Sequence, residues 1–148
     1  AVQQGGKPEL WHGNAQHDAK MHAFLIDTGM PGETGKVVGR FRERLKDDSF
    51  GKSYRETYIP QVNNLVKAYT SGSLTTGMLQ YLSELQLRFF REAIPDPLVS
   101  LWDKGLTAGR YVLKLCGSGG GGYLLGFCEN IGDARKDLQT YDVTEIEI

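Results

Sequence analysis

The amino-acid sequence predicts an α+β fold: a ferredoxin-like split βαβ antiparallel sheet with a helical layer on one face. Three observations predict it. Segments with strand and helix patterns follow one another in the order strand, helices, strand, strand, helix, strand. The two adjacent strands flank a loop of glycine and serine at 117–122. The chain has 148 residues, 40% hydrophobic and 24% charged, which is typical of one globular domain.

The charge balance argues against a general attraction to nucleic acid or to an anionic membrane. The 17 Lys and Arg residues oppose 18 Asp and Glu residues, so the formal net charge is −1. The densest basic stretch, 40–46, is interrupted by Glu43 and followed by Asp47 and Asp48, which is typical of a solvated helix face. No apolar run approaches the length of a membrane span. We therefore expect neither nucleic acid nor a membrane as a partner.

The cysteines and histidines do not have the spacing of a metal site. Cys116 and Cys128 lie near the ends of the two adjacent strands, without a CxxC spacing, so we expect buried free thiols in a reducing cytosol and a cytoplasmic protein. His12, His17 and His22 recur every five residues, which fits neither a helical pair nor one face of a strand. We expect no metal site.

Residues 1–20 are polar, with one short apolar patch, Leu10-Trp11, that could form a strand. The chain begins without an initiator Met, a basic n-region or an apolar h-region, so the sequence predicts no signal peptide. Its abrupt polar start indicates that the chain was cut from a longer one. We interpret 1–20 as the end of a missing N-terminal domain and 21–148 as a domain of its own.

The first predicted strand covers the apolar, β-prone run 21–28 and ends at a turn, 29–32. After the turn, Val37, Val38, Phe41 and Leu45 recur with helical spacing, and Thr34 is a candidate cap for the start of this helix. A strand, a glycine turn and a helix in this order often present backbone amides to an anion.

The middle of the chain, 52–108, is helical by pattern. Pro60 must either kink the first of these helices or begin its second half. Asp96 and Pro97 are typical of a helix cap and first turn, and the helix that follows should end before Gly109. We interpret the apolar stripes as core that packs on the sheet; they consist of Tyr54, Tyr58, Val62, Leu65, Val66 and Tyr69, then Leu74, Met78, Leu82, Leu85 and Phe89, then Leu98, Leu101 and Trp102.

A glycine-rich hairpin follows the helices. Strand patterns at 111–116 and 123–128 flank the loop, and a short helix at 133–138 and a last strand within 141–148 end the chain. A hairpin turn needs about two residues. This longer loop indicates a backbone that lets another group approach closely, or consecutive amides that form a nest for a phosphate. A flexible connector is the alternative, but linkers lie between domains and not between adjacent strands.

Two segments resemble motifs of the GHMP kinases, a family that includes galacto-, homoserine, mevalonate and phosphomevalonate kinases. The stretch 114–122 resembles the third family signature, Lys-Leu-Thr-Gly-Ala-Gly-Gly-Gly-Gly-Cys. Cys116 stands where the family usually has Thr or Ser, Ser118 where it often has Ala, and Tyr123 where mevalonate kinases usually have Cys. The stretch 24–29, followed by Thr34, resembles the Asp-Thr-Gly…Ser/Thr segment that begins the C-terminal domain of mevalonate kinases.

The resemblance implies that 21–148 is the C-terminal domain of an ATP-dependent small-molecule kinase of isoprenoid biosynthesis, which transfers the γ-phosphoryl group of ATP to a hydroxyl, most simply that of mevalonate. ATP and Mg²⁺ would be bound mainly by the missing N-terminal kinase domain, because the nucleotide loop and the catalytic Asp of the family belong there. This chain would then hold no catalytic residue and no metal ligand. The small-molecule substrate and that N-terminal domain are its expected partners, and a homodimer is left open.

The same resemblance implies two groups of site residues. The loop next to the nucleotide phosphates would consist of Gly117, Ser118, Gly119, Gly120, Gly121 and Gly122, and the substrate pocket would include Asp27, Thr28 and Thr34. For Asp27, Thr28 and Thr34 the alternative is a purely structural role in strand-end and helix-cap hydrogen bonds.

Two other functions stay open from the sequence. The aromatic Tyr123 after the glycines is more similar to the fucose and heptose kinases of the same superfamily, whereas the Asp-Thr-Gly segment favours mevalonate. The chain could also be a non-catalytic α+β interaction domain that kept the half-fold without the activity.

Overall fold

The computed structural model describes residues 21–147. The expected strand at Leu10-Trp11 and the interpretation of 1–20 as the end of another domain lie outside the described residues. Strands are β1 (His22–Asp27), β2 (Val112–Leu115), β3 (Tyr123–Cys128) and β4 (Asp142–Ile146). Helices are α1 (Thr34–Arg44), α2 (Asp48–Ser53), the π-helix η1 (Tyr54–Tyr58), α3 (Ile59–Thr70), α4 (Thr76–Phe89), the 3-10 helix η2 (Arg91–Ala93), α5 (Asp96–Ala108) and α6 (Ile131–Asp137).

The strands form one antiparallel sheet in the order β2-β3-β1-β4. The two central strands, β1 and β3, are not consecutive in the chain. The strand that follows β1 through the helices is β2, which lies on the far side of β3, and the strand that follows β3 through α6 is β4, which lies on the far side of β1. This is the order of a ferredoxin-like split βαβ sheet, so the predicted fold class is confirmed.

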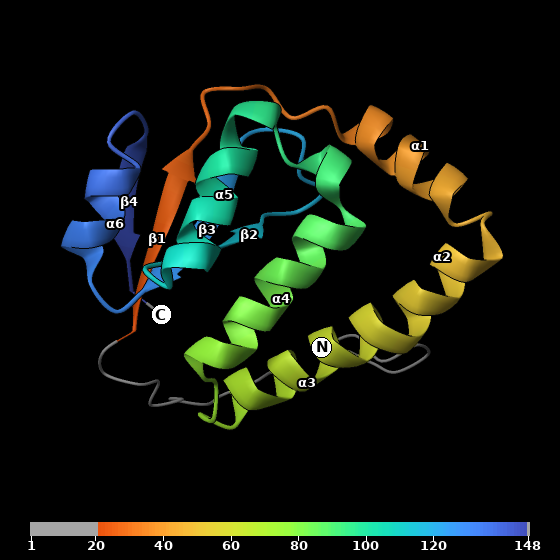
Figure 1. Ribbon diagram of the computed structural model, residues 1–148, viewed down its shortest axis with the longest axis horizontal. Helices are drawn as coiled ribbons and strands as arrows, with labels where there is room; N and C mark the ends of the chain where they lie inside the picture. The colour runs from red at the N-terminus through yellow and green to blue at the C-terminus, as the bar shows by residue number, and fades with distance from the viewer. Residues whose placement is uncertain (1–20, 148) are drawn as a thin grey trace.

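The first face of the sheet carries the main core. Side chains that alternate along the strands, such as Phe24, Ile26 and Leu124, pack against Trp102 of α5 and Leu138, the residue that caps the end of α6. In Figure 1, α5 and α6 lie across this part of the sheet. All five of these side chains are almost completely buried. The buried side chains of this face therefore hold α5 and α6 against the sheet.

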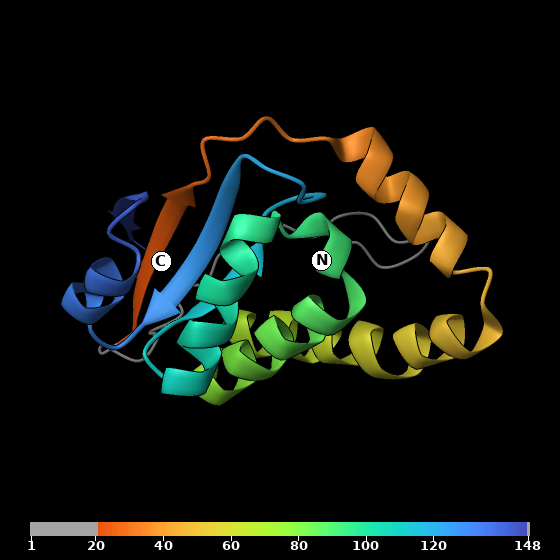
Figure 2. The ribbon, with the colours of Figure 1, turned by 45° about the horizontal axis from the view of Figure 1, so that its top comes forward.

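The remaining helices do not form a flat layer on the same face. Figures 1 and 2 show α1, α2 and α3 as an arch that leaves the sheet after β1 and returns through α4. α4 runs along the edge strand β2, where the side chain of Gln86 accepts a hydrogen bond from the Leu115 N–H at 2.8 Å. Ala68 of α3 and Leu79 of α4 belong to a second, smaller core cluster with Ala23 and Phe127, on the second face of the sheet.

The π-helix explains how Pro60 fits inside a long helical segment. α2, η1 and α3 follow one another without a break from Asp48 to Thr70, and the Ile59 N–H bonds to the Tyr54 carbonyl five residues before it. Pro60 has no N–H and its ring would clash with the carbonyl four residues before it in a regular α-helix. The wider π turn avoids this clash, and of the two predicted roles of Pro60, the start of the second half is confirmed.

Several predicted helix ends were wrong. Thr34 is the first residue of α1 and not its cap: the cap is Glu33, without a side-chain hydrogen bond. Asp96 likewise lies inside α5, which Pro95 caps. α6 begins two residues before the predicted Asp133 because the Asn130 side chain accepts from the N–H groups of its first turn. The predicted end of α5 before Gly109 is confirmed, since Gly109 adopts the left-handed conformation.

The two cysteines are free, as predicted, but they differ in burial. Cys128 is buried in the main core, whereas Cys116 is only half-buried, at the start of the glycine loop. Burial, with the nearby Glu145 charge, raises the pKa of the Cys128 thiol to about 11. The prediction of two buried thiols was therefore right for Cys128 and wrong for Cys116.

No helix within residues 21–147 is both long enough and apolar enough to cross a membrane.

Candidate functional site

The glycine loop follows a path that only glycine adopts easily. All five of its glycines have positive φ: Gly117 (58°), Gly119 (71°), Gly120 (81°), Gly121 (142°) and Gly122 (71°). A side chain at any of these positions would strain the backbone. Ser118 is the one loop residue outside this region of φ. The loop is therefore an ordered structure and not a flexible connector.

Two glycines of this loop pack directly on the turn between β1 and α1 and on the first turn of α1. A Cβ atom on Gly121 would lie 2.6 Å from the Pro31 carbonyl oxygen, and one on Gly120 would lie 2.8 Å from a methyl group of Val37. Two hydrogen bonds join the same segments: the Gly122 N–H donates to the Met30 carbonyl at 2.7 Å, and the Thr28 N–H donates to the Gly122 carbonyl at 2.9 Å. The group that approaches these glycines is thus the protein's own turn.

A third contact fixes the loop to η2. The Gly120 N–H donates to the Ala93 carbonyl at 2.6 Å, and a Cβ on Gly119 would lie 2.8 Å from that same oxygen. The loop is therefore held between the β1–α1 turn on one side and η2 on the other.

These bonds limit what the loop can offer to an anion. The amides of Gly119, Gly120 and Gly122 already donate to protein carbonyls. Within residues 21–147, the amides of Gly117, Ser118 and Gly121 donate no hydrogen bond, and a Cβ at Gly117 would meet nothing within 4 Å. A nest built from every consecutive amide is therefore not present, and three N–H groups are left for a ligand.

Thr34 and Ser118, two predicted site residues 84 positions apart, come together in the structure. Their hydroxyl oxygens lie 2.8 Å apart, and either one can be the donor. Thr34 occupies the first helical turn of α1. Ser118 lies in the glycine loop, which packs on the start of this helix. Each hydroxyl keeps capacity for a further hydrogen bond, so the pair can hold a polar group of a bound molecule. Neither hydroxyl titrates near neutral pH, so the pair can position a ligand but cannot act as a general base.

Asp27 and Thr28 have structural partners in the turn. The Asp27 carboxylate accepts from the Gly29 N–H at 2.9 Å, and the Thr28 hydroxyl accepts from the Met30 N–H at 3.3 Å. Such short-range bonds stabilise the turn after a strand. Thr28 is buried, whereas Asp27 is exposed at the end of β1, opposite Tyr123. Both residues hold the turn on which the glycine loop rests, and a contact with substrate remains a prediction for them.

Two hollows border the loop. The first is an open groove of about 680 Å³ whose floor includes Met30, Pro31 and Gly120. Its charged walls carry Glu33, Lys36, Arg40, Arg91, Glu92 and Asp96, and several of these are paired, as in the bonds from Lys36 to Glu33 and from Arg91 to Asp96.

The second hollow, which we call the aromatic pocket, has a volume of about 140 Å³. Its floor is formed by Leu115, Gly117 and Ser118. Its walls come from α1, η1, α4 and the residue after α4: Val37, Val38, Phe41, Tyr58, Gln86 and Phe90. The aromatic pocket is mostly hydrocarbon and touches the loop at Ser118, the residue that contacts Thr34.

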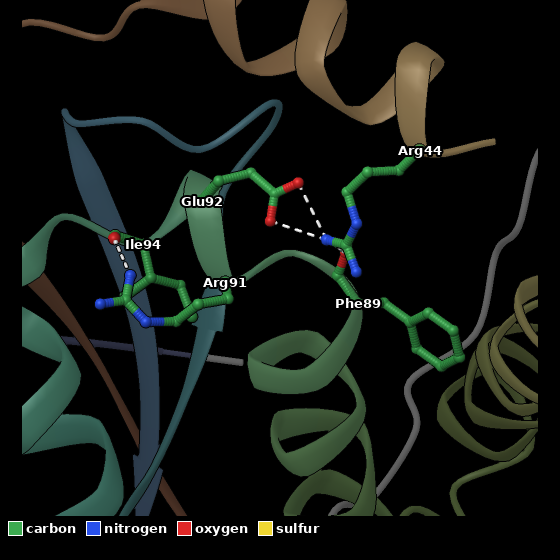
Figure 3. A network of polar contacts seen from close by, with 5 residues as sticks. All are labelled: Arg44, Phe89, Arg91, Glu92 and Ile94. Atoms are coloured by element: carbon green, nitrogen blue, oxygen red, sulfur yellow. Dashed lines mark hydrogen bonds and ion pairs between the residues drawn. The ribbon is translucent and has the colours of Figure 1, made fainter. Parts of the chain in front are cut away.

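An arginine on α1 ties this helix to the rest of the domain. The Arg44 guanidinium bonds to both carboxylate oxygens of Glu92, at 2.9 and 2.7 Å, and to the Phe89 carbonyl at 3.0 Å, as Figure 3 shows. It also lies 4.0 Å from the centre of the Phe50 ring. Burial alone would raise the pKa of Glu92, but the hydrogen bond and charge of Arg44 outweigh it, so that the pKa is lowered. Arg44 therefore fixes α1 opposite η2.

Gln86 and Tyr58 were not predicted as part of the site. The Gln86 amide donates to the Tyr58 hydroxyl at 3.1 Å while its oxygen accepts from Leu115, the last residue of β2 before the loop. Burial raises the pKa of Tyr58, so its hydroxyl stays neutral at pH 7. A signal existed in the sequence: Gln86 lies on the face of α4 that carries Leu82, Leu85 and Phe89, where a polar residue needs a partner.

No group of three or more His, Cys, Asp or Glu residues within 21–147 is arranged to hold a metal ion.

Comparisons with known proteins identify the fold. No protein-family model matches the chain, and no curated protein sequence matches it. Among solved structures, it is similar to mevalonate kinase from L. major, determined in complex with R-mevalonate, with a TM-score of 0.57 and 22% sequence identity. The match covers 81% of this chain and 37% of that one, so the chain spans well under half the length of the solved kinase. The sheet and helices agree with the C-terminal domain of that neighbour. The chain therefore has a GHMP kinase-like fold.

Proposed function

We propose that this chain is the C-terminal part of an ATP-dependent kinase that transfers the γ-phosphoryl group to a hydroxyl of mevalonate. The observation that carries the proposal is the glycine loop, which is held against the β1–α1 turn with three amides free for a ligand. The likeness to a mevalonate kinase over 81% of the chain supports it. The chain spans 37% of that kinase, so the remaining parts of the active site are assigned to an N-terminal domain.

In this proposal the chain supplies one wall of the active site. Bound ATP provides the phosphoryl group, and Mg²⁺ neutralises its charge. The free amides of Gly117, Ser118 and Gly121 point to the role of this chain, which is to donate hydrogen bonds to phosphate oxygens from a backbone that cannot shift. Because the loop is tied to the turn and to η2, these donors need no rearrangement when the ligand binds.

The hydroxyl pair of Thr34 and Ser118 has a separate role in the proposal. It contacts the acceptor and holds the reacting hydroxyl in line with the phosphoryl group. A neutral hydrogen bond of this kind contributes about 1 kcal/mol, which corresponds to roughly a fivefold change in kcat/KM. Its loss should therefore weaken phosphoryl transfer without abolishing it.

The test uses the intact protein that contains this chain, with ATP, Mg²⁺ and separate acceptors: R-mevalonate, fucose and a heptose. We expect turnover of mevalonate, and a roughly fivefold lower kcat/KM in Thr34→Val. Thr144→Val, an equal change on the exposed strand β4, is the control and should keep full activity. Turnover of a sugar but not of mevalonate would refute mevalonate as the acceptor. Absence of both turnover and ATP binding would refute the proposal that the protein is a kinase.

A further inference from the structure

A third hollow lies where α1, α2 and α4 meet, and no residue of the glycine loop lines it. We call it the arginine hollow. It has a volume of about 280 Å³, and the polar side chains in its walls are those of Arg44, Asp47, Ser49, Ser53 and Arg88. None of these residues lines either of the two hollows that border the loop. The arginine hollow is therefore separate from the site described above.

Two aromatic rings in the walls of the arginine hollow hold its two guanidinium groups. The Arg44 guanidinium lies 4.0 Å from the centre of the Phe50 ring, and the Arg88 guanidinium lies 5.1 Å from the centre of the Phe89 ring. The two rings pack on each other, with centres 5.6 Å apart. Both cations are therefore held on one pair of rings before a ligand binds, which reduces the entropy cost of ordering them.

Both arginines keep donors for a further acceptor. The hydrogen bonds from Arg44 to Glu92 and to the Phe89 carbonyl all come from one nitrogen, Nη1, and Figure 3 shows the other terminal nitrogen pointing away from Glu92. Within residues 21–147, Nη2 and Nε of Arg44 donate no hydrogen bond. In the same part of the chain, Arg88 makes one long bond, from Nη2 to the Ser53 hydroxyl at 3.3 Å, and no ion pair. Arg88 is also exposed, so its donors are open to a ligand from solvent.

The remaining polar groups of the arginine hollow are two hydroxyls and one carboxylate. Ser49 and Ser53 lie four residues apart on α2, so their hydroxyls are on the same side of this helix, and each can donate a hydrogen bond. The Asp47 carboxylate caps α2 by accepting from the Phe50 N–H at 2.7 Å, and its negative charge opposes an anion in the hollow. Donors from two cations and two hydroxyls therefore face one carboxylate that already has a partner.

We propose that the arginine hollow binds the phosphate group of a small phosphorylated molecule, with Arg44, Arg88 and the Ser49 hydroxyl as donors. A phosphate group is mainly an acceptor, and the planar guanidinium group matches two of its oxygens at once. The volume of about 280 Å³ equals the space of roughly nine water molecules, so a phosphate group and a few atoms of its carrier fit. The inference does not depend on the proposed function, because no residue of the glycine loop takes part.

NMR of the intact protein that contains this chain tests the site with inorganic phosphate at pH 7 and constant ionic strength. The Nε–Hε signals of Arg44 and Arg88 should shift along one saturable curve, with the same Kd. Arg88→Gln removes a charge-assisted contact and should raise the Kd read at Arg44 by about tenfold or more. Arg42→Gln is the matched control: it is the same change at an exposed residue of α1 outside the hollow, and it should leave the Kd unchanged. Absence of a saturable shift, or equal losses in the two variants, would overturn the proposal.

A second variant changes the affinity in the opposite direction. Asp47→Asn keeps the cap of α2, because asparagine caps a helix as well as aspartate does, and removes the negative charge. It should lower the Kd by roughly two- to fivefold, a gain that a folding defect does not produce, and an unchanged Kd would contradict the proposal.

The backbone N–H signals of the glycine loop separate this inference from the proposed function. Phosphate that binds at the loop should shift the N–H signals of Gly117, Ser118 and Gly121, and these shifts should persist in Arg88→Gln. Their loss together with the Arg44 shift would show one shared site and refute a separate arginine hollow. Shifts at the loop alone would also refute the hollow and leave the proposed function standing. Shifts at the arginines alone would support the hollow and count against the phosphate role proposed for the loop.

Discussion

The substitution Gly121→Ala tests whether the glycine loop is held by close packing. The new methyl group would lie 2.6 Å from the Pro31 carbonyl oxygen and 2.7 Å from the Met30 carbonyl oxygen. Both are backbone atoms, so neither can rotate away, and the loop or the β1–α1 turn must move. The backbone at Gly121 also has φ of 142°, which an alanine adopts only under strain.

The expected cost has two parts. Overpacking of a rigid site costs about 1–3 kcal/mol, and a strained backbone conformation costs a further 1–3 kcal/mol or so. Gly121→Ala should therefore lower the free energy of unfolding by about 2–6 kcal/mol. Gly117→Ala is the matched control: its φ of 58° is also left-handed, but nothing lies within 4 Å of the new methyl group. Its cost is about 1–2 kcal/mol.

Thermal unfolding followed by circular dichroism measures this difference. For a domain of this size, 1 kcal/mol corresponds to about 2–4 °C in Tm. Tm should therefore fall by roughly 4–24 °C in Gly121→Ala and by roughly 2–8 °C in Gly117→Ala. Equal decreases in the two variants would show that close contact with the turn does not hold the loop, and the description of the site as a rigid wall would be refuted.

Three further predictions follow from single side chains. Because Arg44 lowers the pKa of Glu92, the ion pair stabilises the folded state at any pH above the pKa of an unfolded glutamate, and this stabilisation is lost as the pH falls through the lowered pKa. Glu92→Gln should therefore lower the free energy of unfolding, measured in urea, by about 1 kcal/mol at pH 7 and should not change it at pH 2. The raised pKa and burial of Cys128 predict that a thiol reagent at pH 8 labels Cys116 first, so Cys116→Ser should remove the fast phase and no other. Gln86→Leu leaves a buried N–H without its acceptor, which should cost about 1–3 kcal/mol and speed hydrogen exchange of that amide; unchanged exchange would contradict the role given to this side chain.

The sequence predicted most of the elements because their signals are local. An apolar, β-prone run marked β1, apolar and aromatic strand patterns marked the hairpin, and Gly109 marked the end of α5. The sheet order followed from the sequence of elements, since few topologies join them in this way. Helix starts were less certain, because the cap depends on backbone angles that Thr34 and Asp96 do not reveal by residue type alone.

The site was predicted only in part, because its contacts join distant segments. The glycine signature indicated where the loop lies, but its partners, such as Ala93 and Met30, carry no signal of their own. The contact between Thr34 and Ser118 spans 84 residues and depends on the tertiary fold. The aromatic pocket draws on four elements and the loop, and apart from Gly117 and Ser118 its residues were not predicted as site residues. Local patterns therefore located the loop and missed the cavity beside it.

The π turn has a consequence for how the long helical segment tolerates changes in length. A π turn contains one residue more than an α-helical turn. Deleting a single residue within Tyr54–Tyr58 would therefore convert it to a regular turn and leave α2 and α3 facing their present neighbours. The same deletion would bring the Pro60 ring against the carbonyl four positions earlier. The extra residue and Pro60 therefore depend on each other. The shortened variant should form a regular α-helix only when Pro60 is also replaced by alanine.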